Sequence, residues 1–299
     1  VKINIQDDYK CPRYSGLVMK NIKVAESPDW LKTKLKAIGL QPINNIVDIT
    51  NYVMMEWGHP LHAFDLDQLN GNEIIIQSAP KGQTFITLDG EYRTLEGSEL
   101  MICDVQRPIA MAGVMGGYNS GVSANTTTLF LESAYFDPAT IRMASKRHQL
   151  ITDASFRFER GTDPAITPEV LKRTAMLIKS IAGGTIASDL MDQYPNIQKP
   201  AEIELKFSYV DQLLGQTIPR ERMKEILNRL GFTITKSSGD ALTLTVPTYR
   251  VDVTRPVDVV EEIIRIHSLE AIETGNTINA NLSYENDLSR EKLKNKLAN

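Results

Sequence analysis

Apolar residues recur at helical spacing in two stretches of the first two hundred residues. The stretch 28–38 predicts a helix that Ser27 caps and Gly39 ends. The stretch 168–182 predicts a second helix, capped by Thr167. The positions expected to face inward are Trp30, Leu31, Leu35 and Ile38 in the first helix, and Leu171, Ala175, Ile178 and Ala182 in the second. Both stretches therefore predict amphipathic helices that cover a core.

Between these helices the pattern changes to short strands. Glycine, proline and aspartate turn signals separate runs of apolar and β-branched residues. The predicted strands are 74–77, 84–88, 100–103 and 128–132. Strands at this spacing indicate an α+β domain, with a mixed sheet or partly closed barrel and flanking helices.

After the prolines at 195 and 200 the pattern is that of a smaller module. The predicted elements are a strand at 202–207, a helix at 219–230, strands at 232–235 and 242–246 around a hairpin turn at 237–240, and a helix at 256–267. Strand, helix, hairpin and helix in so short a length resemble a winged helix. The sequence therefore predicts a small winged-helix-like α+β domain.

These patterns divide the chain into three segments. We expect a first domain at 1–198, the small domain at 199–275, and a linker with the start of a truncated further domain at 276–299. The chain begins at Val1 rather than methionine, and a helix capped by Ser289 stops without a partner for its apolar stripe. We therefore expect a piece of a longer polypeptide.

Composition narrows the class of protein. Among 299 residues, 42% are hydrophobic and 23% charged, as in a globular protein with a real core. No apolar run is long enough to span a membrane. The two cysteines cannot build a disulfide framework, which favours the cytoplasm. A net charge of −4 argues against a protein that coats nucleic acid, although a local basic contact surface remains compatible with it.

Two of the four histidines, His59 and His62, lie three residues apart, beside Glu56 and Asp65. Such a cluster suits half of a metal site, a general base, or a polar loop whose histidines cap neighbouring backbone. Pro60 between the histidines argues against a zinc-binding helix. No second cluster offers an obvious further ligand, so the residues alone leave these readings open.

Glu132 stands inside an apolar run, where an unpartnered charge would be costly. A structural ion pair, a strand end and a specific ligand contact are all compatible with it. The glycine-rich turn at 113–121 fits neither the dinucleotide-binding nor the phosphate-binding loop pattern. Its glycines suit either tight turns or close backbone approach to a ligand.

Two charged stretches are further candidates. Cations and aromatic residues alternate at 146–161, which suits either contact with phosphates and bases or a solvated surface. Asp252, Asp258, Glu261 and Glu262 gather around the start of the last predicted helix. Such oxygen ligands suit Mg²⁺, and favourable interaction with the helix N-terminus explains Asp258 but not Glu262.

Five motifs, taken in order and spacing, resemble the editing domain of the bacterial phenylalanyl-tRNA synthetase β-subunit family. They are PINNIVDITNYV at 42–53, GHPLHAFD at 58–65, MAGVMGG at 111–117, LESAYF at 131–136 and TDASFRFERGTDP at 152–164. The resemblance covers about 10–195. PTYRVD at 247–252 and DVVEEIIRI at 258–266 resemble the small domain that follows it in the family.

This resemblance implies post-transfer editing, the hydrolysis of the ester in tyrosyl-tRNA(Phe). It implies that Glu132 reads the tyrosine hydroxyl and that His62 positions water or the terminal ribose, or transfers a proton. The implied substrate-binding residues are Gly116 and Gly117, through a backbone N–H, with Thr152 and Ala154. Gln41 departs from the family pattern, which has an arginine there, and this weakens the expectation of strong editing.

The resemblance also implies partners and cofactors. Asp252, Asp258, Glu261 and Glu262 match positions used for a Mg²⁺ shared with the α subunit. The full synthetase is expected to be an α2β2 ligase that uses ATP, binds tRNA(Phe) and works in the cytoplasm, with no role for DNA or a membrane. This part alone is expected to edit at most, without charging tRNA.

Two other functions compete with editing. The chain could be a non-catalytic module that binds RNA or a partner subunit through the basic stretch and the small domain. It could also be a metallohydrolase that uses His59, His62 and Asp65. The ordered motifs favour the editing hydrolase over both.

Overall fold

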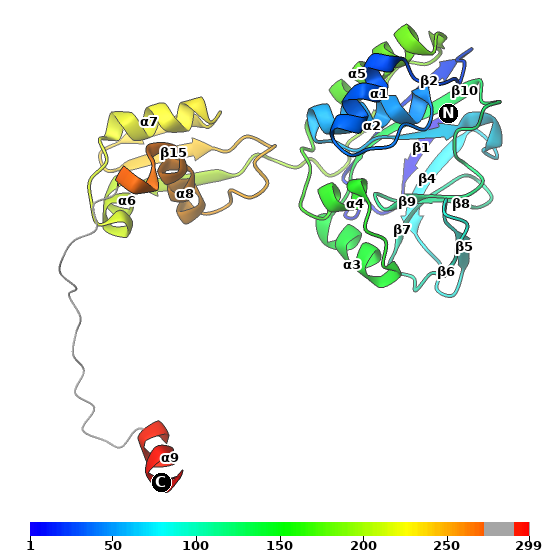
Figure 1. The fold of residues 1–299 in the computed structure, drawn as a ribbon. Coiled ribbons are helices and arrows are strands. Elements are labelled where there is room, and N and C mark those ends of the chain that lie inside the picture. The colour runs from blue at the N-terminus through cyan, green and yellow to red at the C-terminus, as the bar shows by residue number, and fades with distance from the viewer. Residues whose placement is uncertain (272–289, 299) are drawn as a thin grey trace.

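The computed structural model describes residues 1–271 and 290–298. The chain forms two lobes, joined by an extended segment after residue 193 (Figure 1). Residues 276–289 of the predicted linker, including the cap Ser289, lie outside the described residues. The helix α9 (Arg290–Ala298) is described, and its Leu293 and Leu297 are exposed. No helix within the described ranges is long and apolar enough to cross a membrane.

Two sheets and a hairpin build the first lobe. The first sheet has the order β1 (Lys2–Ile5), β4 (Glu73–Ser78), β7 (Leu100–Cys103), β8 (Pro108–Met111) and β9 (Met115–Gly116). The second has the order β11 (Thr185–Ile186), β2 (Arg13–Lys20), β10 (Thr128–Tyr135) and β3 (His62–Asp65), and β12 (Met191–Gln193) also pairs with β2. The hairpin consists of β5 (Thr84–Ile86) and β6 (Tyr92–Thr94). The predicted α+β class is confirmed, and these strands form separate sheets rather than a closed barrel.

The second sheet separates two hydrophobic cores. Because successive side chains of a strand point to opposite faces, Phe130 and Ala134 of β10 enter one core, whereas Leu129 and Leu131 enter the other. The first core lies toward the first sheet and includes side chains of α3 (Pro138–His148) and α4 (Asp153–Phe158). The strand is therefore apolar on both faces, which makes the polar Glu132 between Leu131 and Ser133 conspicuous.

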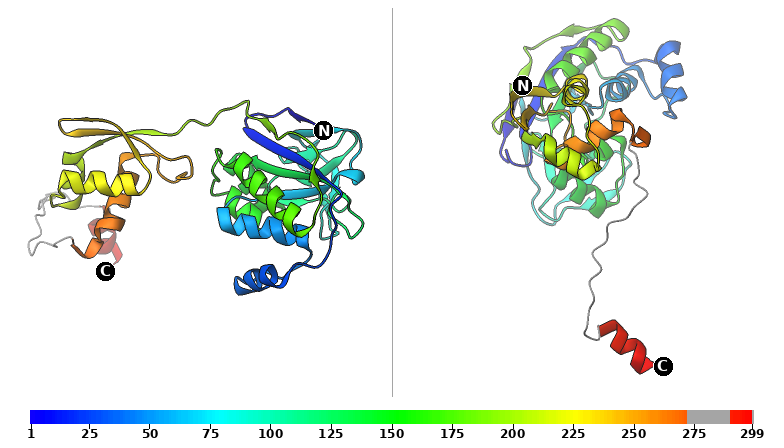
Figure 2. Two further views of the ribbon diagram at one scale, coloured as in Figure 1. Left: turned by 90° about the horizontal axis from the view of Figure 1, so that it is seen from above. Right: turned by 90° about the vertical axis from the view of Figure 1, so that its left-hand side faces the viewer.

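Helices α1 (Asp29–Ala37), α2 (Asn45–Trp57) and α5 (Thr167–Ile181) cover the other face of the second sheet. α2 and α5 lie side by side against it (Figure 2). The short helix η1 (Leu66–Gln68) follows β3. The end of α2 and the start of β3 thereby lie close to the turn between β8 and β9, although that turn belongs to the first sheet.

The predicted helices at 28–38 and 168–182 are confirmed as α1 and α5, but their predicted caps are wrong. The Ser27 hydroxyl donates to Asp48 Oδ2 at 2.5 Å instead of capping α1. Thr167 is the first residue of α5, and its hydroxyl pairs with that of Ser15. Both side chains instead form hydrogen bonds with residues of other elements. Trp30 and Ile38 are also exposed rather than buried, so the inward stripe of α1 is narrower than predicted.

The second lobe is an antiparallel sheet of three strands with helices on it. The sheet has the order β13 (Glu202–Lys206), β15 (Ala241–Thr245) and β14 (Thr233–Ser238). The helices are α6 (Phe207–Leu214), α7 (Arg220–Arg229), α8 (Pro256–His267) and the short η2 (Leu269–Ala271). The predicted strands and the helices at 219–230 and 256–267 are confirmed, whereas α6 was not predicted. Ser237 and Ser238 belong to β14, so the hairpin turn falls later than predicted.

Candidate functional site

A pocket of about 320 Å³ opens where several segments of the first lobe meet. These segments are α2, the start of β3, the turn between β5 and β6, β7, β8 with the β8–β9 turn, β10 and α4. Five of the six residues that the sequence assigned to editing line it: His62, Gly116, Glu132, Thr152 and Ala154. Residues up to ninety-two positions apart in the sequence are thus brought into one cavity by the packing of the two sheets.

Glu132 is the buried acid of this pocket, with only 5% of its surface exposed. Its Oε2 accepts a hydrogen bond of 2.7 Å from the hydroxyl of Tyr14, which lies on β2. Burial raises the pKa of the Glu132 carboxyl to about 7, and the hydrogen bond from Tyr14 limits that rise. The carboxyl is therefore poised between its charged and neutral forms near neutral pH.

His62 lies directly opposite Glu132, because β3 and β10 pair with these two residues in register. Its Nε2 is buried and has no hydrogen-bond partner among the described residues. Burial lowers the pKa of the imidazole to about 4, so His62 is neutral at neutral pH. Its ring packs edge-on against Phe64, with 4.4 Å between the ring centroids. A neutral ring with an unused nitrogen can accept from, or donate to, a ligand in the pocket.

Gly116 closes the pocket against His62. A Cβ at this position would lie 2.9 Å from Cε1 and 3.2 Å from Nε2 of the imidazole, so only glycine leaves the ring in place. Gly117 N donates to Ile109 O at 2.8 Å. Since hydrogen-bonded and non-hydrogen-bonded pairs alternate in antiparallel strands, Gly116 opposite Ala110 is a non-hydrogen-bonded pair. The N–H of Gly116 therefore points away from β8.

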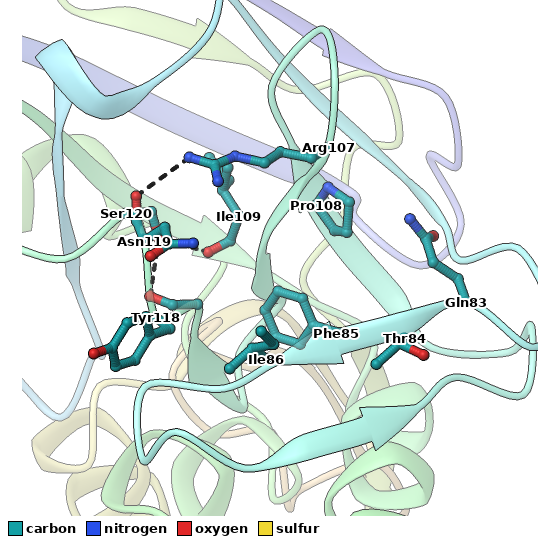
Figure 3. Close-up of a pocket in the computed structure, with 11 residues that line it drawn as sticks. Gln83, Thr84, Phe85, Ile86, Arg107, Pro108, Ile109, Tyr118, Asn119 and Ser120 are labelled. Atoms are coloured by element: carbon teal, nitrogen blue, oxygen red, sulfur yellow. Dashed lines mark hydrogen bonds between the residues drawn. The ribbon is translucent and has the colours of Figure 1, made fainter.

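Gly117 does not line this pocket. It lines a second one of about 230 Å³, between β5 and the strand β8, together with side chains such as Phe85, Arg107 and Tyr118 (Figure 3). Its N–H is already used in the bond to Ile109. Of the two glycines expected to offer a backbone N–H to the substrate, the geometry is compatible with Gly116 alone.

Thr152 and Ala154 belong to the beginning of α4. The Thr152 hydroxyl donates to Val114 O at 2.9 Å and accepts from Ser155 N at 3.0 Å. It thereby caps the helix and ties it to the β8–β9 turn. Thr152 shapes the pocket wall with both hydrogen-bonding roles already filled, and Ala154 contributes a small apolar surface.

The histidine cluster does not form a metal site. Because side chains alternate along β3, His62 and Asp65 point to opposite faces of the sheet. Asp65 accepts from Thr126 and from the N–H of Asp67, which caps η1. His59 is buried edge-on against Phe158. Across residues 1–271 and 290–298, no three His, Cys, Asp or Glu side chains gather as metal ligands.

The acidic residues at the start of α8 are held by arginines. Arg250 binds both Asp252 and Glu262, at 2.8 and 2.6 Å. Asp258 pairs with Arg255 and accepts from its backbone N–H, which holds the pKa of that carboxyl below its usual range. The fourth residue, Glu261, is exposed. Because arginines occupy these three carboxylates, the set does not fit a Mg²⁺ in this chain by itself, and no chemical step is assigned to the metal.

The basic stretch 146–161 forms the end of α3 and all of α4. Arg147 and His148 hold the buried carboxylate of Glu99. The guanidinium of Arg160 stacks over the ring of the half-exposed Phe156, 3.6 Å from its centroid. Part of the stretch is therefore structural, and part faces solvent.

Sequence reasoning missed several residues of the pocket. Asn51 and Met54 of α2, Leu88 of the hairpin and Asp153 of α4 also line it. Asn51 lies within the motif at 42–53, so that motif was the available signal. Gln41 is exposed in the loop between α1 and α2 and does not line the pocket.

Two protein families match the chain. The B3/4 domain family matches residues 10–183, and the tRNA synthetase B5 domain family matches residues 203–268. The phenylalanine–tRNA ligase β subunit of Bacteroides fragilis strain YCH46 is 45% identical over 299 residues, which cover 100% of this chain and 36% of that protein. That of Porphyromonas gingivalis strain W83 is 48% identical over 291 residues, 97% of this chain and 35% of that protein.

A solved structure is also similar, an N-terminal fragment of the phenylalanyl-tRNA synthetase β subunit from Pyrococcus horikoshii. It is 14% identical with a TM-score of 0.41, and the match covers 89% of this chain and 74% of that one.

The chain spans 36% of the length of the first curated relative that it matches. The resemblance inferred from the ordered motifs is confirmed. Since the B3/4 match extends over more than half of the sequence and includes every residue of the pocket, the chain belongs to the B3/4 domain family. Residues 203–268, which follow this match, are similar to the tRNA synthetase B5 domain family.

Proposed function

We propose that this chain is the editing part of a phenylalanine–tRNA ligase β subunit, and that its pocket hydrolyses the ester of tyrosyl-tRNA(Phe). The observation that carries the proposal is the pairing of Glu132 with His62 in one pocket. The pocket thus contains a buried carboxyl, which can form a hydrogen bond with a hydroxyl of the substrate, and a neutral imidazole, which can form one with a group at the ester.

Selectivity for tyrosine follows from the burial of Glu132. A synthetic site shaped for phenylalanine rejects an added hydroxyl by only about 10²-fold. A site that requires the hydroxyl discriminates better, because phenylalanine would leave a buried polar group without a partner. Tyr14 occupies one oxygen of Glu132, and no other hydrogen bond from the described residues reaches the carboxyl. Glu132 lines the pocket, and we assign its second oxygen to the phenol of the substrate.

His62 acts at the other end of the substrate. Ester hydrolysis adds water oxygen to the carbonyl carbon, breaks the bond to the terminal ribose and returns a proton to the ribose oxygen. An imidazole whose pKa is about 4 is a weak base at neutral pH, so it accepts a hydrogen bond more readily than it removes a proton. We assign His62 to orienting the water or the terminal ribose, with Gly116 keeping the ring in position.

The larger assembly is part of the same proposal. Since the curated relatives are about three times as long as this chain, the ligase reaction belongs to the whole protein. We propose an α-subunit partner, tRNA(Phe) as the substrate carrier, and ATP and Mg²⁺ for the full synthetase in the cytoplasm. The four acidic residues around α8 would bind a Mg²⁺ only after rearrangement or with further ligands, because residues 1–271 and 290–298 hold no group of three potential metal ligands.

A non-catalytic binding module is the second candidate. The exposed stack of Arg160 on Phe156 favours it, since such pairs suit contact with the bases of single-stranded RNA. A module of this kind would bind tRNA without releasing the amino acid. Hydrolysis therefore distinguishes the two candidates.

Deacylation assays test the editing proposal. We expect the β subunit that contains this chain, assembled with its α partner, to hydrolyse tyrosyl-tRNA(Phe) faster than phenylalanyl-tRNA(Phe). Glu132→Ala should reduce that preference at least tenfold, because the hydroxyl loses its partner. Glu91→Ala, on the exposed hairpin turn, is the matched control. Equal preference in the Glu132→Ala and control proteins would refute the assignment of Glu132.

A further inference from the structure

Tyr14 forms a hydrogen bond with Glu132, although it lies outside every motif that pointed to the pocket. It is fully buried on β2, and its hydroxyl donates to Oε2 of Glu132 at 2.7 Å. In the pairing of β2 with β10, Gly16 lies opposite Glu132 and Tyr14 lies opposite Ala134. Tyr14 is therefore the diagonal neighbour of Glu132 on the same face of the sheet.

The packing around Glu132 leaves its carboxyl little freedom. The ring of Phe130 lies over Gly16, where a Cβ would come within 2.4 Å of the ring. The phenol of Tyr14 and the ring of Phe130 thus fill the side of Glu132 that faces β2, and His62 lies on the other side, on β3. Glu132 itself lines the pocket, so a ligand there can reach the carboxyl oxygen that Tyr14 does not hold.

We propose that Tyr14 is the positioning residue for tyrosine selectivity: its hydroxyl holds one oxygen of Glu132, so that the other meets the phenol of the substrate. The inference rests on the proposed editing function. In this role, a tyrosine of the protein holds in place the carboxyl that recognises the tyrosine of the substrate. A carboxyl fixed in this way does not have to be ordered when the substrate binds, which favours discrimination.

The charged and titratable groups around Glu132 make this role measurable. Burial, and then the charge of Glu132, raise the pKa of Tyr14 and that of Cys11 well above their usual values, so both stay protonated near neutral pH. Burial keeps His62 neutral, with a pKa of about 4. Glu132 is then the group of this set that titrates near pH 7. Removing the Tyr14 hydroxyl takes away a bond that favours the carboxylate, so the pKa of Glu132 should rise.

The test is Tyr14→Phe, which keeps the ring and removes only the hydroxyl. The ratio of kcat/KM for tyrosyl-tRNA(Phe) to that for phenylalanyl-tRNA(Phe) is measured from pH 6 to 9 in the assembled synthetase. We expect this ratio to be about tenfold lower in Tyr14→Phe than in the unchanged synthetase at pH 7. The pH at which the ratio changes by half should be higher in Tyr14→Phe. Tyr135→Phe, on the opposite face of β10, is the matched control and should leave both unchanged.

Infrared titration provides a readout that does not depend on activity. The carbonyl band of protonated Glu132, assigned by its loss in Glu132→Gln, should persist to higher pH in Tyr14→Phe than in the unchanged chain. If the band, the ratio and its pH dependence are all unchanged in Tyr14→Phe, while Glu132→Ala reduces the preference for tyrosine, the role of Tyr14 is overturned. Absence of tyrosyl-tRNA hydrolysis by the unchanged synthetase would instead overturn the proposed function, and this inference with it.

Discussion

His62 of β3 lies opposite Glu132 of β10, and burial shifts the pKa values of these two groups in opposite directions. The pKa of the carboxyl rises to about 7 and that of the imidazole falls to about 4, so the carboxyl can hold a proton while its neighbour does not. The pair therefore does not form a strong ion pair at neutral pH. Both groups can therefore form hydrogen bonds with a ligand. The proposed roles, in which Glu132 binds the tyrosine hydroxyl and His62 orients the water or the ribose, depend on this.

Replacing His62 should slow hydrolysis without changing selectivity. In His62→Ala the group that orients the water or the ribose is lost, and we expect kcat for tyrosyl-tRNA(Phe) to fall about 10²-fold. The preference for tyrosine over phenylalanine should remain, because Glu132 still reads the hydroxyl. Single-turnover deacylation measures both quantities. His267→Ala, in α8 of the other lobe, is the control, and equal rates in the two variants would exclude His62 from the reaction.

A methyl group at position 116 should disturb the same imidazole. The Cβ of Gly116→Ala would lie 2.9 Å from His62 Cε1, so the ring must turn or the β8–β9 turn must shift. We expect the rate of hydrolysis to fall at least tenfold. The protein should still fold, because the backbone at position 116 is not in the left-handed region. Gly121→Ala is the matched control, because its Cβ would meet only Leu88, at an ordinary 3.4 Å. Full activity in Gly116→Ala would contradict the fit described between the glycine and the ring.

The stability of the first lobe should depend on pH through Glu132. Because its folded pKa of about 7 lies above the ordinary 4.5, the folded state binds the proton more tightly. The stabilisation of the folded state that comes from this proton is complete below pH 4.5 and is lost as the pH rises through 7. In Glu132→Gln no such proton is lost, so the variant should gain stability relative to the unchanged chain between pH 4.5 and 7, by up to about 3 kcal/mol.

Urea unfolding at several pH values, followed by the fluorescence of Trp30 and Trp57, measures this difference in the free energy of unfolding. Both tryptophans lie in the first lobe. Both proteins retain His59 and His62, whose lowered pKa values act in the opposite direction, so the difference isolates Glu132. A difference that does not change with pH would mean that the carboxyl is already ionised throughout this range.

The sequence predicted those elements whose pattern is local. α5, α7 and α8 have one buried face, and β7 is an apolar run between turns, so periodicity and turn residues sufficed. The strand β2 was missed because six consecutive residues are buried and no alternation marks a face. α2 was also missed, although Ile46, Ile49 and Val53 recur at helical spacing on its buried face.

The same distinction applies to the site. Glu132 stood out because a carboxylate within an apolar strand needs a reason, and Gly116 because glycines gathered in one turn. Tyr14 gave no such signal, because a tyrosine in an apolar stretch is ordinary and its partner is 118 positions away. The pairing of Glu262 with Arg250 was likewise invisible, since helical spacing showed the crowding of acids but not the arginine that approaches from the preceding loop.

That pairing leads to a prediction for the second lobe. Glu262 is buried and accepts hydrogen bonds from both Arg250 and Arg265, whereas its neighbour Glu261 is exposed. Removing one member of a largely buried ion pair leaves the other without compensation, so Glu262→Ala should destabilise this lobe by about 2–3 kcal/mol. Glu261→Ala should change its stability by less than about 0.5 kcal/mol.

Hydrogen exchange of the amides of β15 measures this stability, because the lobe contains no tryptophan and the two lobes need not unfold together. The same amides test the metal. Since Arg250, Arg255 and Arg265 hold three of the four carboxylates, we expect neither Mg²⁺ nor a chelator to change the exchange rates of this chain alone. Protection on adding Mg²⁺ that is lost in Glu262→Ala would show that the metal displaces the arginines. Glu262 would then be a metal ligand in the isolated chain, and the structural role argued for it here would be wrong.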